Sequence, residues 1–125
     1  MISSEQYEEL IVGEIEKETE FLDASIYHLD GPDALRHLDR ILQIPKLSGV
    51  QWVYGAGQPS ASQWLDVVRK IQAAGMCVVI EVKAQELEVM LKESAPEGVF
   101  YQVSGVRSET HARELMKMAE TIRRQ

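Results

Sequence analysis

The chain has 125 residues, of which 45% are hydrophobic and 26% charged, which is ordinary for a soluble globular domain. Its formal net charge of -7 disfavours nucleic acid and anionic membrane as partners. Its apolar runs are far shorter than a membrane span and no signal-peptide pattern opens it, so we expect no membrane partner and a cytoplasmic location. A single cysteine excludes an internal disulfide and any multi-cysteine zinc site.

The order of predicted elements is a helix followed by four strand–helix units. Ser3 and Gln6 fit a capping box, and apolar residues at helical spacing predict a helix over about residues 4–21. The predicted strands cover residues 25–30, 47–54, 77–82 and 99–104. The helices between and after them are predicted over 33–42, from a Ser60 cap to Gly75, around 87–91 before Pro96, and from Ser108 onward.

This alternation predicts an α/β fold with four parallel βα units preceded by a helix. A closed barrel of this type takes eight strands, so we expect half of a (β/α)8 TIM barrel, a single partial-barrel domain over residues 1–125. An open arc of four strands exposes its edges and one face, which invites pairing with another copy. We therefore expect a homodimer.

Polar side chains interrupt the predicted strands near their carboxyl ends. Because strand side chains alternate between faces, His28 and Asp30 share one face, as do Gln102 and Ser104, while Glu81 interrupts an apolar strand. The carboxyl ends of parallel strands are where α/β proteins assemble their sites. The candidate catalytic residues are therefore His28, Asp30 and Glu81, with Ser104 at the same end of the sheet.

Each of these polar residues also has a structural interpretation. His28 is equally well explained as a hydrogen-bonded structural histidine, and Asp30 precedes Gly-Pro, a common turn sequence. Glu81 could instead pair with a basic side chain. Gln51 and Gln102 could instead be interior amides whose hydrogen bonds are satisfied.

Three further residues are expected to serve the fold alone. His37 and His111 lie on predicted helices and should face solvent, and Cys77 at a strand start should pack in the core.

Gly55-x-Gly57-x-x-Ser60, between a predicted strand and a helix, weakly resembles a dinucleotide-binding turn. The third glycine is absent and Pro59 removes an amide donor, so a glycine-rich surface loop is the favoured interpretation. Nucleotide binding remains a third hypothesis.

Several segments together are similar to a known family: "SIYHLDGPDALRHLDRILQIPKLSGVQWVYGAG", Trp64, "KIQAAG" and "VSG" near the end. They resemble the C-terminal half of the uroporphyrinogen decarboxylase superfamily, most closely its cobalamin-dependent methyltransferase or trimethylamine–corrinoid protein branch. The resemblance runs from Ser3 to the last helix. It implies that this chain supplies the last four βα units of a barrel.

The resemblance implies methyl transfer between a corrinoid and a thiol, with zinc held by a His-x-Cys pair and a later cysteine. His28 matches the histidine, while Asp30 and Ser104 stand at the two cysteine positions, which leaves a weak ligand set. The implied partners are the missing N-terminal half-barrel and a corrinoid protein, and the chain alone should be inactive. A stand-alone dimerising α/β module and a porphyrinogen carboxy-lyase are the alternatives.

Overall fold

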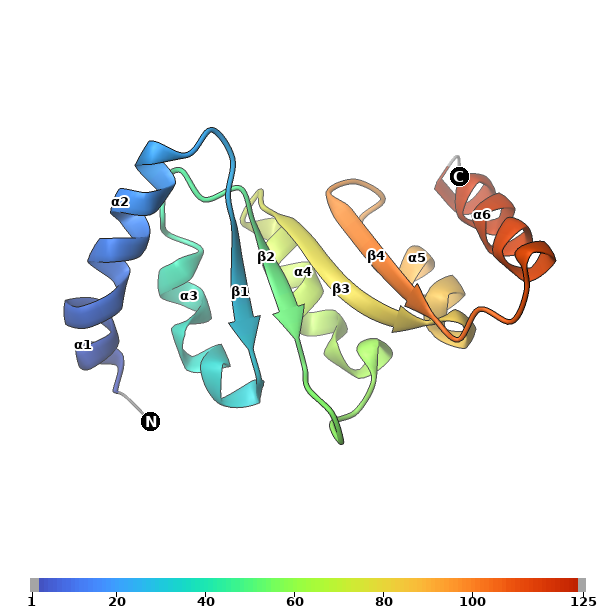
Figure 1. Ribbon diagram of the computed structural model, residues 1–125, viewed down its shortest axis with the longest axis horizontal. Coiled ribbons are helices and arrows are strands. Elements are labelled where there is room, and N and C mark those ends of the chain that lie inside the picture. The colour runs from blue at the N-terminus through green and yellow to red at the C-terminus, as the bar shows by residue number, and fades with distance from the viewer. Residues whose placement is uncertain (1–2, 124–125) are drawn as a thin grey trace.

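A computed structural model describes residues 3–123, in which four parallel strands form one sheet (Figure 1). The strands are β1 (Ile26–Asp30), β2 (Gly49–Val53), β3 (Cys77–Lys83) and β4 (Val99–Ser104). Their order in the sheet follows the sequence, β1-β2-β3-β4, and all three pairings are parallel. The predicted α/β fold with four parallel units is confirmed.

Helices precede, connect and follow the strands. The first is continuous over residues 4–21, as α1 (Ser4–Tyr7), the π-helical η1 (Glu8–Val12) and α2 (Gly13–Phe21), and is called the N-terminal helix below. The crossover segments each begin with a 3-10 turn: η2 (Pro32–His37) with α3 (Leu38–Ile41), η3 (Ala61–Trp64) with α4 (Leu65–Ala73), and η4 (Ala84–Glu86) with α5 (Leu87–Glu93). The last helix is α6 (Glu109–Arg123).

The N-terminal helix starts with the predicted capping box and packs against the first crossover. The Gln6 amide N–H donates to Ser3 Oγ over 3.1 Å, and the Ser3 N–H donates to Gln6 Oε1 over 2.9 Å. Further along, Arg40 of α3 bridges Glu8 and Glu16, with a closest N–O distance of 2.7 Å to each. The two ion pairs hold the N-terminal helix against the first crossover.

His37 is buried, with 8% of its surface exposed, so its predicted solvent-facing position is wrong. Its ring stacks on that of Tyr7 at a centroid distance of 3.8 Å and an interplanar angle of 10°. The prediction assumed a regular α-helix over 33–42. Residues 32–37 instead form 3-10 turns, with three residues per turn, which changes the direction of the side chain.

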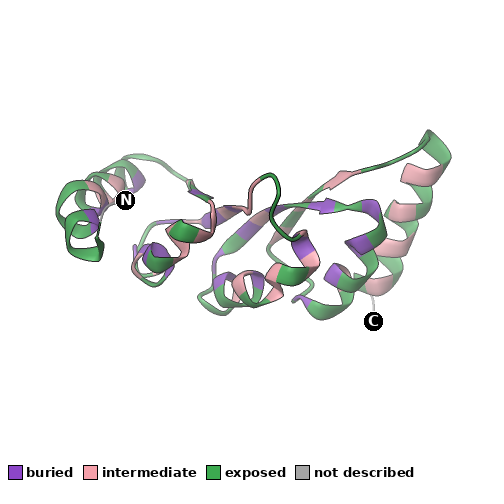
Figure 2. Ribbon diagram, turned by 90° about the horizontal axis from the view of Figure 1, so that it is seen from below, coloured by how far each residue is buried: buried purple, intermediate pink, exposed green. Residues whose placement is uncertain are grey.

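One face of the sheet carries the core. Alternate strand residues face α3, α4 and α5 and are buried, namely Leu29, Val50, Trp52, Val78, Ile80 and Val82. Figure 2 shows these crossover helices on a single side of the sheet, where buried segments of strand and helix meet.

No described helix covers the opposite face of the sheet, called the open face below. It consists of Ile26, His28, Asp30, Gln51, Val53, Cys77, Val79, Glu81, Lys83, Phe100, Gln102 and Ser104. Cys77 is exposed there, so its predicted place in the core is wrong: the strand alternation directs it away from the helices. Among residues 3–123, no helix has the length and apolar character needed to cross a membrane.

Candidate active site

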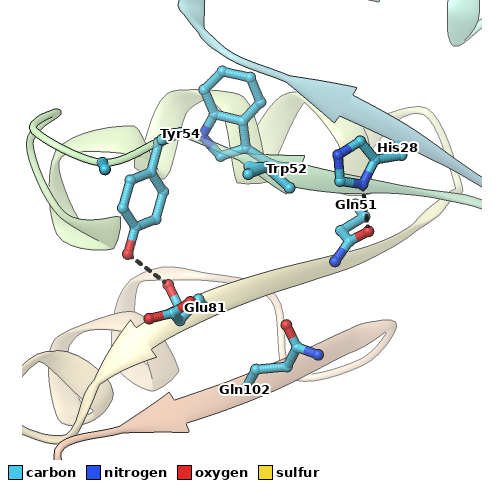
Figure 3. A pocket seen from close by; sticks show the side chains of 9 residues that line it. His28, Gln51, Trp52, Tyr54, Glu81 and Gln102 are labelled. Carbon is cyan, nitrogen blue, oxygen red and sulfur yellow. Dashed lines mark hydrogen bonds between the residues drawn. The ribbon is translucent and has the colours of Figure 1, made fainter.

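A pocket of about 480 Å³ lies on the open face toward the carboxyl ends of the strands. Side chains from all four strands or the loops after them line it, and its polar members are His28, Gln51, Tyr54, Glu81 and Gln102. Figure 3 shows these groups around the hollow above β2, β3 and β4. The sheet register explains the grouping, because parallel strands that end together bring residues distant in sequence to one edge.

His28 and Gln51 are register partners on β1 and β2, and their side chains are hydrogen-bonded. His28 Nδ1 lies 2.8 Å from Gln51 Oε1. Because an amide oxygen can only accept a hydrogen bond, Nδ1 is the donor. In the neutral imidazole the proton therefore sits on Nδ1, and Nε2 keeps its lone pair. Figure 3 shows Nε2 on the side of the ring turned away from Gln51. A histidine in this state accepts a proton or binds a metal at Nε2.

Asp30 lies near the same imidazole, as predicted from their shared face. Its Oδ2 is 4.0 Å from His28 Nε2, with the side chains of His28 and Asp30 58% and 68% exposed. The pair is an ion pair only while the imidazole is protonated. Water screens such an exposed pair strongly, so Asp30 stabilises an imidazolium at this position modestly.

Glu81 and Tyr54 form the wall of the pocket opposite His28. The Tyr54 hydroxyl donates to the backbone carbonyl oxygen of Glu81 over 3.1 Å. Burial, followed by the nearby charges of Glu81 and Glu86, raises the pKa of Tyr54, so the phenol stays protonated at neutral pH. The structural interpretation of Glu81 was that it pairs with a basic side chain. Among residues 3–123 its carboxylate forms no ion pair.

Tyr54 is a pocket residue that was not among the predicted site residues. It follows Gln51 by an odd number of positions, so strand alternation alone would place it on the opposite face. The strand ends at Val53, and the chain turns into the glycine loop from Tyr54 onward. The signal that could have identified it is its place directly after the carboxyl end of a strand.

The predicted metal ligands do not form a zinc site on their own. His28 and Asp30 supply two donors, while the Ser104 hydroxyl donates to the backbone carbonyl of Val82 over 3.4 Å. The residues described by the structure contain no group of three His, Cys, Asp or Glu side chains that could hold a metal ion. A structural or catalytic zinc ion takes at least three protein ligands, so the donors found among residues 3–123 do not by themselves fit one.

The glycine loop after β2 leads into a hydrogen-bonded cluster centred on Glu86. The Glu86 carboxylate accepts hydrogen bonds from the hydroxyls of Ser60 and Ser62. It also accepts from two backbone N–H groups, that of Ser62 at 3.2 Å and that of Lys83 at 3.4 Å. Burial favours a higher pKa for Glu86, but these hydrogen bonds outweigh it and hold the pKa below its ordinary value. Ser60 does precede η3 as its N-cap residue, but its hydroxyl bonds Glu86 and makes no capping hydrogen bond, so the predicted side-chain cap is absent. A phosphate at this turn would compete with the Glu86 carboxylate for its donors.

Comparison of the chain with protein-family models, curated proteins and solved structures found no match.

Proposed function

We propose that the chain is one half of a (β/α)8-barrel enzyme and that its open face is the inner wall of that barrel. The distribution of side chains on the face supports this proposal. Apolar residues gather toward the amino ends of the strands, with Ile26 and Phe100 54% and 62% exposed. Polar residues gather at the carboxyl ends, around His28 and Glu81. An apolar floor beneath a polar mouth is the arrangement by which such barrels fill their interior and build a site.

The reaction we propose, by the family resemblance, is methyl transfer between a corrinoid and a thiol. A thiol accepts a methyl group as its thiolate, so a group in the site must remove the sulfur-bound proton. The hydrogen bond between His28 and Gln51 is the observation that carries the proposal, because it leaves Nε2 of His28 free to take that proton. Asp30 then stabilises the imidazolium, and the protonated Tyr54 remains a donor to a polar group of the substrate. This route needs no zinc ligand from this chain.

A porphyrinogen carboxy-lyase is the second candidate, and the pocket favours it less. Porphyrinogens carry several carboxylates, which cationic side chains would have to bind. The part of the pocket that residues 3–123 provide contains the Glu81 side chain and no lysine or arginine. This wall repels a polycarboxylate and suits an uncharged substrate group that accepts or donates hydrogen bonds.

The site is complete only with a second wall, so the chain alone is inactive in this account. Methyl transfer from methylcobalamin to a thiol, measured for the chain in complex with the proposed other half of the barrel, tests the proposal. His28→Gln in that complex should lower kcat at least about a hundredfold, the usual contribution of a general base. His111→Gln, a change on an exposed helix, is the matched control. Unchanged turnover in the His28→Gln complex would refute the proposal.

A further inference from the structure

The two edge strands of the sheet each have one side without a strand partner. β1 pairs only with β2, and β4 only with β3, among the residues that the structure describes. Closing a parallel barrel adds one strand beside β1 and another beside β4. The helices that already lie outside these two edges limit which partner can add those strands.

A helix is already in place beyond each edge. At the β1 edge, the N-terminal helix is held by the hydrogen bond of 2.9 Å between the hydroxyls of Tyr7 and Tyr27. At the other edge, α6 follows β4 and packs on α5. Figure 1 shows the two helices at opposite ends of the molecule, outside β1 and β4. In a (β/α)8 barrel one helix covers the outside of each gap between neighbouring strands.

The ratio of helices to strands therefore argues against a closed barrel of two identical copies. Residues 3–123 contain four strands and five helical segments: the N-terminal helix and the segments that end in α3, α4, α5 and α6. Two copies would place β4 of one beside β1 of the other at both junctions. Each junction would then receive α6 from one copy and the N-terminal helix from the other, two helices for one gap.

From this count we infer that the open face takes a non-identical partner, a half-barrel with four parallel strands and only three helices. The inference rests on the proposed function, in that the face is taken as the interior of a barrel. With such a partner, the flanking helices of this chain cover both junctions and each of the eight gaps receives one helix. The partner needs apolar inward residues at the amino ends of its strands, opposite Ile26 and Phe100.

An apolar groove at the β4 edge supports the assignment. It has a volume of about 310 Å³ between β4, α5 and α6, and its lining includes Tyr101, Val103, Leu115 and Met116. None of residues 109–123 in α6 is buried, and Met116 is 68% exposed. The groove lies beside the free edge of β4, so a strand added there would cover it with its outward side chains. We therefore assign the groove to the first strand of the partner half.

The test uses the full chain and two designed half-barrels as probes. One has four parallel strands and three helices, and its matched control has the same strands with five helices. Cys77, exposed on the open face, reports closure through its rate of thiol labelling. The three-helix probe should form a one-to-one complex by light scattering and slow the labelling at least tenfold, whereas the five-helix probe should not.

Three outcomes would overturn the inference: a stable dimer of the chain alone with slowed Cys77 labelling, equal binding of both probes, or failure of the three-helix probe to bind. Met116→Glu should weaken the one-to-one complex at least tenfold, while Thr121→Glu, elsewhere on α6, should not; equal affinities would remove the groove from the interface. Labelling and mass need no turnover, so these results stand apart from the assay of methyl transfer.

Discussion

His28 and Gln51 face each other from adjacent parallel strands, and their side chains are joined by a hydrogen bond of 2.8 Å between Nδ1 and Oε1. A cross-strand pair on one face of a sheet is held by the register of the strands, so neither side chain depends on a loop for its position. The bond selects the imidazole tautomer with its proton on Nδ1. It makes Gln51 a positioning residue for the candidate base.

Replacing Gln51 by Leu should change the tautomer of His28. Without the amide oxygen, nothing in the described pocket holds the proton on Nδ1, and the Nε2-protonated form should become the major one. Nitrogen-15 chemical shifts of the neutral imidazole distinguish the two forms directly. Gln102→Leu, in the same pocket but without a bond to His28, should leave the shifts as they are. An unchanged tautomer in the Gln51→Leu protein would show that the amide does not position the ring.

The buried His37 should make the attachment of the N-terminal helix sensitive to pH. Burial, followed by the charge of Arg36, lowers the pKa of His37 from its ordinary value of 6.5. The unfolded chain therefore binds a proton more readily than the folded one, and stability falls as pH drops below about 6.5. Urea unfolding at pH 7.5 and 5.5 measures this loss. His37→Phe, which keeps an aromatic partner for Tyr7, should reduce it, whereas His111→Gln should not; equal losses in all three proteins would contradict the assignment.

Glu86 should be the most stabilising carboxylate of the loop region. Glu86→Ala leaves the hydroxyls of Ser60 and Ser62 and two backbone amides without their acceptor, and should lower the free energy of unfolding by about 2 to 3 kcal/mol. Glu93→Ala removes an exposed ion pair with Arg69 and should cost less than about 1 kcal/mol. Chemical denaturation gives both values. Similar costs for the two variants would mean that the cluster contributes no more than a surface pair.

Truncating a side chain should cost much more stability on the helix-covered face of the sheet than on the open face. Ile80 is fully buried against the helices, and Ile80→Ala should cost about 2 to 5 kcal/mol in the free energy of unfolding. Phe100 is 62% exposed on the open face, and Phe100→Ser should change the free energy of unfolding of the isolated chain by only about 0.5 kcal/mol. The same Phe100→Ser change should weaken binding of the three-helix probe. A large loss of stability from Phe100→Ser alone would indicate that the chain already covers this face.

The strands and their order could be predicted because apolar runs bounded by glycine and proline leave few alternatives. The side-chain alternation that placed His28 and Asp30 together also followed from sequence, since it depends only on the spacing along one strand. The hydrogen bond from His28 to Gln51 could not be predicted from the sequence, because it depends on the register between two strands and joins residues 23 positions apart. Periodicity within a strand carries no information about that register.

The errors at Cys77 and His37 have separate physical causes. The Cys77 prediction treated an apolar residue in a parallel strand as buried, although one face of this sheet has no covering layer among residues 3–123. The His37 prediction treated the first crossover as a uniform α-helix, and missed that the N-terminal helix would offer Tyr7 as a stacking partner. Both depend on how elements far apart in sequence meet.

The central claim is that the open face is an uncovered barrel interior, and amide hydrogen exchange of the isolated chain tests it most directly. β2 and β3 have strand neighbours on both sides, whereas β1 and β4 each have one. The account predicts slow exchange throughout β2 and β3, and fast exchange at the alternate amides of β1 and β4 that point away from the sheet. Slow exchange at every amide of β1 and β4 in a monomeric chain would show that the outer edges of these strands are already covered and would contradict the account.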